Sequence, residues 1–456
     1  MQEFNDEFIA KVKEKIEGQN KKYYILTMGC QLNENDSEKI AGILESMGYQ
    51  KTEELLDSDI IIYNTCCVRE NAEERLFGKV GEVKKLKESK DVILAIGGCM
   101  MQEKGMVEKL KKSYHYIDIV FGTHTLQNLP EDIYKVLVRN EKVKDVLDID
   151  GEVYEGFPIR RNDNYRASVT IMYGCNNFCT YCIVAYVRGR ERSREPEKIL
   201  YEVESLAKEG YKEITLLGQN VNSYKGNDKI KNFADLLNEV CKIDGIERVK
   251  FISPHPKDFT DDVIDAIANN DKIARLVHLP LQSGNTKVLK EMNRNYSKEQ
   301  YLTLVDKMKA KIPNIEFSTD IIVGFPGETD EEFEDTLDVA RKVNFEQIFM
   351  FIYSVREGTI AARRDDQVPE NIKHQRFDKL KELYDSKVDE NNEKYINTIQ
   401  KLLVEGDSKN DPNTLTGRTD TNKVVIFDKK EGINTGDIVS IKITEAHKWY
   451  LKGEIV

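Results

Sequence analysis

Cysteine is scarce in this chain, and its scarcity limits the kind of protein that the sequence can encode. Only 8 of the 456 residues are cysteine, which is too few for the disulfide framework of a small secreted domain. We therefore expect reduced thiols and a cytoplasmic protein. The sequence also has a single tryptophan and no apolar run long enough to span a bilayer. Residues 1–22 are charged and lack the apolar core of a secretory signal.

An excess of positive charge is also missing. The chain has 68 Lys and Arg against 80 Asp and Glu, which gives a formal net charge of −12. This balance argues against nonspecific binding to nucleic acid by bulk charge, although it leaves room for a local basic site. We expect a monomer that binds neither a membrane nor DNA. A chain of this length usually folds into two or three domains.

Three of the eight cysteines lie within eight residues of one another. Cys175, Cys179 and Cys182 have the spacing CxxxCxxC. The strand-like run 167–173 leads into them and Gly174 ends that run, so we expect the cysteines on a loop at the end of a strand. Iron–sulfur clusters are held by cysteine thiolates and normally take four. Three thiolates on one loop can hold a [4Fe-4S] cluster and leave one iron open for substrate chemistry, as an open position does at a catalytic zinc.

A structural zinc knuckle and incidental buried cysteines are also compatible with this loop. A zinc knuckle usually pairs CxxC with a second Cys/His pair, and no such pair follows nearby. A zinc-dependent RNA-binding protein, which would be colourless, therefore stays an alternative. A non-catalytic iron–sulfur electron carrier or scaffold is a further alternative.

Three further cysteines share one position relative to predicted strands. Residues 23–150 alternate apolar runs with helical patterns, which predicts an open parallel βαβ domain. Cys30, Cys66 and Cys99 each follow such a run, and the carboxyl ends of parallel strands line one edge of a sheet. We therefore predict a second three-cysteine cluster, although cysteine is also an ordinary small buried residue. Cys67 would point the other way if the strand geometry continued, so it is left out of the site.

Residues 167–391 repeat the strand–helix alternation about six times. This predicts a partial (β/α)6 barrel, whose active site would lie at the carboxyl ends of its strands. Polar side chains follow several of these strands, and the solvation of loops is enough to account for any one of them. The expected strands begin near Val169, Ile214, Val249, Leu276, Phe317 and Ile348.

Three other stretches complete the chain. Residues 1–22 look like a charged extension, by default a solvated helix, and residues 151–166 look like a linker. Residues 392–456 contain short β-rich runs between Gly and Asn turns, which predicts a small antiparallel β-barrel of a kind that often binds nucleic acid. Four arginines between residues 188 and 194 are either a phosphate-contacting segment or a solvated turn.

These features together resemble a known family, the radical-SAM methylthiotransferases. CxxxCxxC with Tyr181 before the last cysteine is typical of the radical S-adenosylmethionine (SAM) superfamily. The earlier cysteines Cys30, Cys66 and Cys99 and a terminal domain similar to the TRAM RNA-binding module are typical of the methylthiotransferases. Four stretches resemble in particular the branch of this family that acts on dimethylallyladenosine in tRNA. They are residues 173–182, 217–223, 253–256 and 319–329.

The resemblance implies a division of labour between two [4Fe-4S] clusters. Cys175, Cys179 and Cys182 would hold the cluster that cleaves SAM to a 5′-deoxyadenosyl radical. The second cluster would carry the sulfur, and a second SAM would donate the methyl group. Its implied ligands are Cys30, Cys66 and Cys99. The implied SAM contacts are Tyr181, Gln219, Ser253, Gln282 and Asp320.

The implied partners are tRNA and an electron donor of the flavodoxin or ferredoxin type. No general base is indicated, because abstraction of a hydrogen atom does not require one. Other members of the family act on threonylcarbamoyl-adenosine in tRNA or on an aspartate of a ribosomal protein. The stretches quoted above favour the dimethylallyl substrate.

Overall fold

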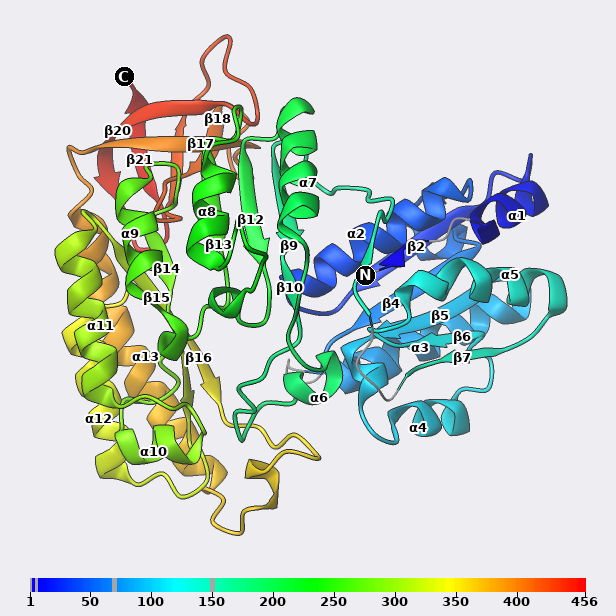
Figure 1. Ribbon diagram of the computed structural model, residues 1–456, viewed down its shortest axis with the longest axis horizontal. Coiled ribbons are helices and arrows are strands. Elements are labelled where there is room, and N and C mark those ends of the chain that lie inside the picture. Colours follow the sequence, from blue (N-terminus) through cyan, green and yellow to red (C-terminus); the bar gives the residue numbers. More distant parts are fainter. Residues whose placement is uncertain (1, 5–6, 68–71, 148–151) are drawn as a thin grey trace. The chain divides into compact units, whose positions relative to one another are not determined.

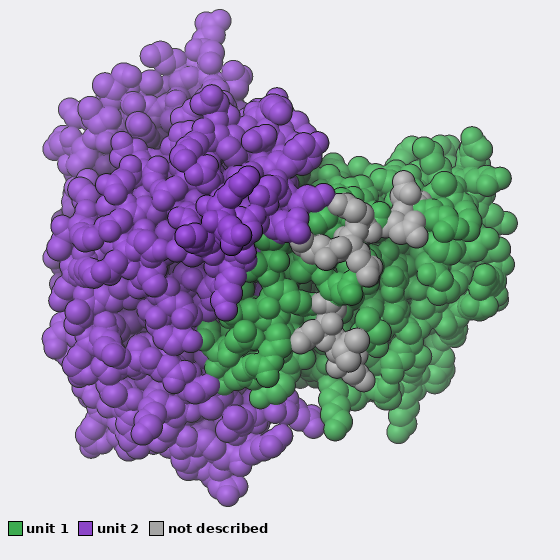
Figure 2. Space-filling view, viewed as in Figure 1, with its two compact units in different colours: residues 1–162, 172–178, 182–194 green, residues 163–171, 179–181, 195–456 purple. Residues whose placement is uncertain are grey.

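The computed structural model describes the chain except residues 1, 5–6, 68–71 and 148–151. It forms two compact units, which Figure 2 distinguishes by colour. Unit 1 comprises residues 1–162, 172–178 and 182–194, and unit 2 comprises residues 163–171, 179–181 and 195–456. The cysteine loop is therefore divided, with Cys179 in unit 2 and the other two cysteines in unit 1. The boundary expected at residues 150 and 151 lies outside the described residues.

A parallel sheet of six strands forms the centre of unit 1 (Figure 1). Its order is β3-β2-β4-β5-β6-β7, and every neighbouring pair is parallel. The open parallel sheet predicted for this part of the chain is confirmed. The strands are β2 (Lys22–Thr27), β3 (Gln50–Lys51), β4 (Ile60–Thr65), β5 (Ile93–Gly98), β6 (Ile119–Phe121) and β7 (Val143–Asp145).

Helices cover both faces of this sheet because its central strands are apolar on both sides. Ile61 and Tyr63 of β4 pack with α3 and α4, whereas Ile60 and Ile62 pack with α1, α2 and α5. The helices are α1 (Glu7–Ile16), α2 (Gln31–Ser46), α3 (Ala72–Ser89), α4 (Met106–Ser113) and α5 (Leu129–Arg139). The short 3₁₀ turns are η1 (Leu55–Asp57), η2 (Cys99–Gln102) and η3 (Leu126–Asn128).

The first helix is not merely a solvated extension, as its charge had suggested. Val12 of α1 is fully buried and Ile16 nearly so, and both belong to the hydrophobic core on one face of the sheet. Ile9 of the same helix also packs against this core, so apolar positions one turn apart dock the charged helix. Smaller elements also belong to unit 1, namely β1 (Gln2–Glu3) with β8 (Tyr154–Glu155), β10 (Met172–Tyr173) with β11 (Arg192–Ser193), and α6 (Val184–Arg188).

Unit 2 contains the expected partial barrel. It consists of two parallel three-stranded sheets, β9-β12-β13 and β14-β15-β16, and a single bridge joins Val249 to Ile273 between them. All six strands begin within three residues of the expected positions. They are β9 (Arg166–Thr170), β12 (Glu213–Leu217), β13 (Arg248–Phe251), β14 (Leu276–His278), β15 (Glu316–Val323) and β16 (Gln347–Ile352).

Local capping signals fix where several helices of the partial barrel begin. The Thr329 hydroxyl accepts from the Glu332 N–H at 3.3 Å, and the Glu332 carboxylate accepts from the Thr329 N–H at 2.9 Å, so this capping box starts α12.

Nowhere in the described residues is a helix both long and apolar enough to cross a membrane. The helices are α7 (Pro196–Lys208), α8 (Phe233–Cys241), α9 (Asp261–Asn269), α10 (Thr286–Glu291), α11 (Lys298–Lys311), α12 (Asp330–Val343) and α13 (Glu370–Glu393), with 3₁₀ turns η4 (Val221–Ser223), η5 (Pro256–Asp258) and η6 (Ala361–Arg363).

The end of the chain forms a closed five-stranded barrel of order β17-β18-β19-β21-β20. Closure removes the exposed edges that an open sheet would leave. Four of its neighbouring pairs are antiparallel, as expected, but β19 and β21 are parallel. The strands are β17 (Ile399–Asp407), β18 (Thr414–Arg418), β19 (Val424–Asp428), β20 (Ile438–Ala446) and β21 (Leu451–Ile455).

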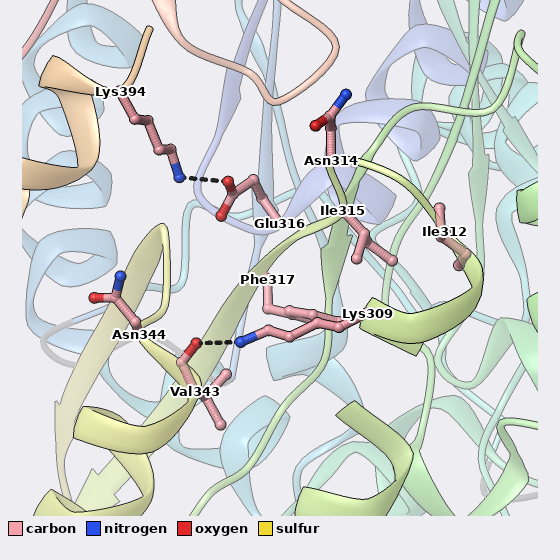
Figure 3. A pocket seen from close by; sticks show the side chains of 9 residues that line it. All are labelled: Lys309, Ile312, Asn314, Ile315, Glu316, Phe317, Val343, Asn344 and Lys394. Carbon is pink, nitrogen blue, oxygen red and sulfur yellow. Dashed lines mark hydrogen bonds and ion pairs between the residues drawn. The ribbon is translucent and has the colours of Figure 1, made fainter. Parts of the chain in front are cut away.

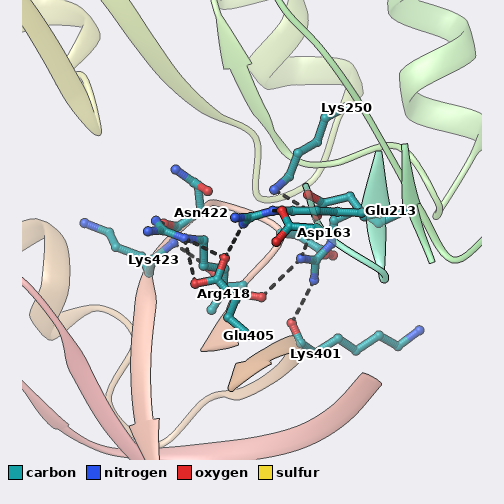
Figure 4. A network of polar contacts seen from close by, with 12 residues as sticks. Asp163, Glu213, Lys250, Lys401, Glu405, Arg418, Asn422 and Lys423 are labelled. Atoms are coloured by element: carbon teal, nitrogen blue, oxygen red, sulfur yellow. Dashed lines mark hydrogen bonds and ion pairs between the residues drawn. The ribbon is translucent and has the colours of Figure 1, made fainter. Parts of the chain in front are cut away.

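A buried polar network joins this closed barrel to the amino-terminal ends of β12 and β13 (Figure 4). Arg248, the first residue of β13, is 3% exposed. Its guanidinium pairs with Glu213 at 3.3 Å and with Asp420 at 2.8 Å, and it donates to the carbonyl oxygens of Arg418 and Lys401. One guanidinium thus connects the start of the partial barrel to three segments of the closed barrel.

A shallow pocket of about 250 Å³ opens at the amino-terminal end of β15 (Figure 3). Lys309 donates to the Val343 carbonyl oxygen at 2.9 Å, and Lys394 pairs with Glu316. These charged groups of the pocket already have partners. The pocket lies at the end of β15 away from Val323. Because catalytic residues of such barrels lie at the carboxyl ends of the strands, this pocket is not the candidate site.

Candidate iron–sulfur centres

The three amino-terminal cysteines lie next to the carboxyl ends of neighbouring strands of the unit 1 sheet. Cys30 precedes α2 as its N-cap residue, Cys66 directly follows β4, and Cys99 begins η2 directly after β5. Cys66 and Cys99 are buried, whereas Cys30 is exposed. The connections that place them at one edge are those of parallel βαβ units.

Asn33 ties these three strand ends together, and sequence reasoning missed it. Its side chain is fully buried. Its Oδ1 accepts from the Cys30 thiol at 3.3 Å, and its Nδ2 lies 4.0 Å from the Cys99 Sγ. The same Nδ2 donates at 3.1 Å to the carbonyl oxygen of Thr65, the residue before Cys66. A single asparagine in the first turn of a helix carries no sequence signal of such a role.

Cys67 turns towards Cys99, contrary to the expectation that it would point away. The strand β4 ends at Thr65, so strand alternation no longer applies two residues later. Cys67 is buried beside Cys99 and donates a hydrogen bond to its sulfur. This bond and the positive charge of Arg188 lower the pKa of the Cys99 thiol to about 6, although burial acts in the opposite direction. The same bond and burial raise the pKa of Cys67 well above its usual range.

Two arginines of the basic run after the cysteine loop are buried, whereas Arg190 is exposed. Arg188 is 4% exposed and Arg194 is 8% exposed. The Arg194 guanidinium binds both carboxylate oxygens of Glu155, at 2.8 and 2.7 Å. The Arg190 guanidinium lies 4.4 Å from the centre of the Phe178 ring. Arg188 and Arg194 are therefore buried groups with partners inside the protein.

A tight backbone surrounds Cys175 in unit 1. Gly174 has φ +77°, and a Cβ there would lie 2.0 Å from the carbonyl oxygen of Arg190, so only glycine fits. The Cys175 N–H donates to the Gly189 carbonyl oxygen at 3.0 Å, and its sulfur accepts from the Asn177 side chain at 3.5 Å. The loop is thus closed onto the segment that returns after α6.

Within unit 2, a buried arginine contacts the sulfur of Cys179. Arg294 is 5% exposed, and its Nη1 donates to the Cys179 Sγ at 3.6 Å. Its Nε donates to the Tyr296 hydroxyl at 3.0 Å and its Nη2 to the Pro280 carbonyl oxygen at 3.0 Å. Sequence reasoning did not single out Arg294, because it lies more than a hundred residues from the cysteine that it contacts.

The donor sets of both regions fit a thiolate-held cluster. Across the ranges that the structure describes, no three Cys, His, Asp or Glu side chains form a ready metal site. Each region nevertheless offers cysteine sulfurs together with buried N–H donors directed at them, from Asn33 and Arg188 in one and from Arg294 in the other. Hydrogen bonds to sulfur of this kind tune iron–sulfur clusters.

The carboxyl ends of the partial barrel's strands hold buried polar atoms without partners. In a folded protein such atoms are rare unless a ligand or water satisfies them. One such atom is the Oε1 of Gln282, a residue that precedes α10 and is 7% exposed. Among the described residues, those at this end of the barrel are Gln219 Oε1, Asn220 Oδ1, His255 Nε2, Gln282 Oε1 and the Tyr353 hydroxyl.

The backbone is strained at the same end. In the described chain, 11 non-glycine residues have positive φ, and 8 of them are asparagine, which tolerates that conformation. The other three are Phe178 of the cysteine loop, Ser253 with φ +59° and Gln282 with φ +68°. Ser253 and Gln282 were both expected to contact a ligand. Strain of this kind is concentrated at ligand sites.

Of the remaining expected contacts, Tyr181 lies in the cysteine loop and Asp320 lies on β15. Tyr181 packs against a buried cluster that includes Phe325 and Tyr353. Asp320 lies in the middle of β15, and its Oδ2 is 3.3 Å from the Nε2 of His278, which sequence reasoning missed. Backbone hydrogen bonds also join Gln282 to β15, since its N–H donates to the Asp320 carbonyl oxygen at 2.8 Å.

His255 is held neutral in this region. It is 5% exposed, and burial lowers the pKa of its imidazole to about 2. Its Nδ1 accepts from the Lys257 N–H at 3.2 Å, which assigns the ring proton to Nε2. Its Nε2–H is therefore a buried donor that the described residues leave without an acceptor.

Three family models match the chain. The radical SAM superfamily matches residues 169–340, an uncharacterized protein family called UPF0004 matches residues 22–122, and the TRAM domain matches residues 393–456. The UPF0004 match falls on the unit 1 sheet, the radical SAM match on the partial barrel and the TRAM match on the closed barrel.

Curated relatives match nearly the whole chain. A Clostridium botulinum protein named tRNA-2-methylthio-N(6)-dimethylallyladenosine synthase is 52% identical over 436 residues, which are 95% of this chain and 96% of that protein. Proteins of the same name from Clostridium beijerinckii and Clostridium perfringens are 49% and 51% identical over 98% and 96% of this chain, and the matches cover 99% and 98% of those proteins.

Solved structures share the fold at low identity. The radical S-adenosylmethionine methyltransferase TsrM from Kitasatospora setae, with tryptophan and a SAM analogue bound, gives a TM-score of 0.54 at 15% identity and covers 74% of each chain. The same enzyme with cobalamin and a [4Fe-4S] cluster gives 0.54 at 14% identity, covering 75% of this chain and 77% of that one. At this identity the likeness shows the fold alone.

Proposed function

Because the chain belongs to the family of the tRNA-2-methylthio-N(6)-dimethylallyladenosine synthases, we propose that it inserts sulfur and transfers a methyl group to carbon 2 of N(6)-dimethylallyladenosine in tRNA, next to the anticodon. The family assignment confirms the resemblance drawn from the sequence and the enzyme class, a radical SAM methylthiotransferase. The use of SAM and a [4Fe-4S] cluster follows from the radical SAM superfamily.

Six cysteines are the proposed cluster ligands. When bound, the first cluster would supply the electron that cleaves SAM to a 5′-deoxyadenosyl radical, and the second would carry the sulfur. The protein's own groups hold and screen these sites. The ligands of the first are Cys175, Cys179 and Cys182, and those of the second are Cys30, Cys66 and Cys99.

The buried polar atoms at the carboxyl ends of the barrel strands carry the assignment of a SAM site. Gln219 and Gln282 present acceptors without partners, and His255 presents a donor. SAM offers hydroxyl, amino and carboxylate groups that can satisfy both kinds of atom. Because His255 stays neutral, it would orient the ligand by hydrogen bonding and not act as an acid. The proposed SAM contacts are Tyr181, Gln219, Ser253, Gln282 and Asp320.

The closed barrel would bind tRNA. Its match to the TRAM domain and the names of the relatives support a tRNA substrate. Trp449 is 67% exposed, and the Lys448 ammonium lies 5.4 Å from the centre of its ring. An exposed aromatic with a neighbouring cation suits stacking on a base. We further propose that the protein is a cytoplasmic monomer and that a flavodoxin- or ferredoxin-type protein donates its electrons.

The deciding experiment uses the anaerobically reconstituted, reduced protein. It is incubated with SAM and with tRNA that carries dimethylallyladenosine, and the nucleosides are then measured by mass spectrometry. A 2-methylthio product is expected, and tRNA carrying threonylcarbamoyl-adenosine should give none. 5′-Deoxyadenosine without the methylthio product would overturn the substrate assignment. Absence of both from a preparation with intact clusters would favour an electron carrier.

A further inference from the structure

A guanidinium from the segment after the cysteine loop lies inside the amino-terminal cysteine site. Arg188 ends α6, only six residues after Cys182, and it is 4% exposed. Its Nε donates to the Cys99 Sγ at 3.0 Å. Its Nη1 pairs at 2.8 Å with the Oδ2 of Asp36 in α2, the helix that Cys30 precedes.

The surroundings leave this guanidinium incompletely satisfied. Among the described residues, its Nη2 is buried and has no acceptor. Arginine has five N–H donors and no acceptor, so a buried unpaired Nη2 requires an anionic or oxygen- or sulfur-bearing neighbour. Residues from the start of α6 help to hold it there, since Ile183 and Val187 pack with Cys99 and Cys67 in one buried cluster.

We propose that Arg188 is a positioning and charge-compensating residue of the second cluster. This inference rests on the second cluster proposed above. Its N–H groups would face the sulfurs of the cluster, and its charge would stabilise the reduced form, which carries one more negative charge than the oxidised form. Hydrogen bonds to sulfur and net charge set the reduction potential of such clusters, so Arg188 raises the midpoint potential of this one. Asp36 acts in the opposite direction, because its carboxylate neutralises part of that charge.

Arg194 provides a matched control in the same segment. It is also buried, at 8% exposed, and its guanidinium also pairs with an acidic residue, Glu155. The Nε and Nη2 of Arg194 donate to the two oxygens of that carboxylate, whereas the Nε of Arg188 donates to a cysteine sulfur. Removing either arginine therefore breaks a buried ion pair, and the loss of Arg188 also removes a charge bonded to a proposed cluster ligand.

The experiment isolates the second cluster in the full chain. A parent variant with Cys175→Ala, Cys179→Ala and Cys182→Ala is reconstituted anaerobically, and its iron, its thermal melting and its midpoint potential by EPR-monitored titration are measured. In this background Arg188→Gln should shift the midpoint to a more negative potential. Arg188→Lys should give a smaller negative shift, because it keeps the charge. Asp36→Asn should give a positive shift, and Arg194→Gln should leave the potential unchanged.

The outcomes separate this inference from the cluster itself. A parent variant without iron would overturn the second cluster and the role of Arg188 together. Full iron with an unchanged potential in Arg188→Gln would overturn only the role of Arg188, as would an equal shift in Arg194→Gln. If Arg188→Gln does not fold, Asp36→Asn decides the matter, because only a positive shift in that variant is compatible with charge compensation at the cluster.

Discussion

The cysteine loop and the sheet edge in unit 1 are the two proposed cluster sites, and they bring their cysteines together in different ways. The loop gathers its cysteines within eight residues, so a local turn presents them. At the sheet edge, cysteines more than thirty residues apart lie next to the ends of adjacent parallel strands. The first proposed site is therefore specified by spacing in the sequence and the second by topology.

Both regions nevertheless share one feature, a buried arginine that contacts a cysteine sulfur. Arg294 lies 3.6 Å from the Cys179 sulfur and Arg188 lies 3.0 Å from the Cys99 sulfur. Each arginine is distant in sequence from its cysteine. The comparison shows that cysteines can follow a local pattern in the sequence while the arginines that contact their sulfurs do not.

The largest expected effect comes from removing one set of cysteines at a time. Replacing the three loop cysteines with alanine should abolish 5′-deoxyadenosine formation, because SAM then has no cluster to cleave it. Replacing the three sheet-edge cysteines should spare that reaction and remove about half of the iron, since each site would hold one four-iron cluster. Iron analysis and product assay check both variants. Unchanged iron content in the second variant would contradict a cluster at the sheet edge.

The next largest effect is expected from Arg294, the arginine that contacts the sulfur of Cys179. Arg294→Gln should reduce 5′-deoxyadenosine formation by about 10–100-fold, as loss of a group supporting a metal ligand typically does. Arg376→Gln is the matched control, because Arg376 is also 5% exposed but its guanidinium pairs with the carboxylates of Glu328 and Asp330. Rates at saturating SAM test this. Equal losses in the two variants would point to general destabilisation.

A variant outside both sites should change stability and leave the clusters intact. Arg248→Met breaks the buried pair with Glu213 and Asp420 and should cost about 3–5 kcal/mol. Hydrogen exchange in β17–β21 should accelerate, while the iron content stays unchanged. Loss of iron in this variant would mean that the clusters depend on the closed barrel.

The smallest expected effect distinguishes two neighbouring cysteines. Cys67→Ala should keep both clusters and lower stability by about 1 kcal/mol, the centre of the range for point variants. Cys66→Ala should lose the second cluster, because Cys66 is a proposed ligand. Iron content and thermal melting measure both. The reverse pattern would transfer the ligand role to Cys67.

Much of the fold could be predicted because it depends on local patterns. Apolar runs gave the strand positions, and the Thr329 capping box lies where α12 begins. The expectation for Cys67 failed because β4 ends at Thr65, a boundary that alternation does not reveal. The parallel pairing of β19 with β21 also follows from barrel closure rather than from any feature of either strand.

By itself the sequence determined the cysteine spacing, the order of strands and helices, and the family, because these depend on residues close together in the chain. Only the tertiary structure decided that Asn33 joins three strand ends, that Arg188 and Arg294 contact cysteine sulfurs, and that two arginines of the basic run are buried. The physical reason is that a buried charge or amide must find its partner wherever the fold brings one, and sequence distance does not record that choice.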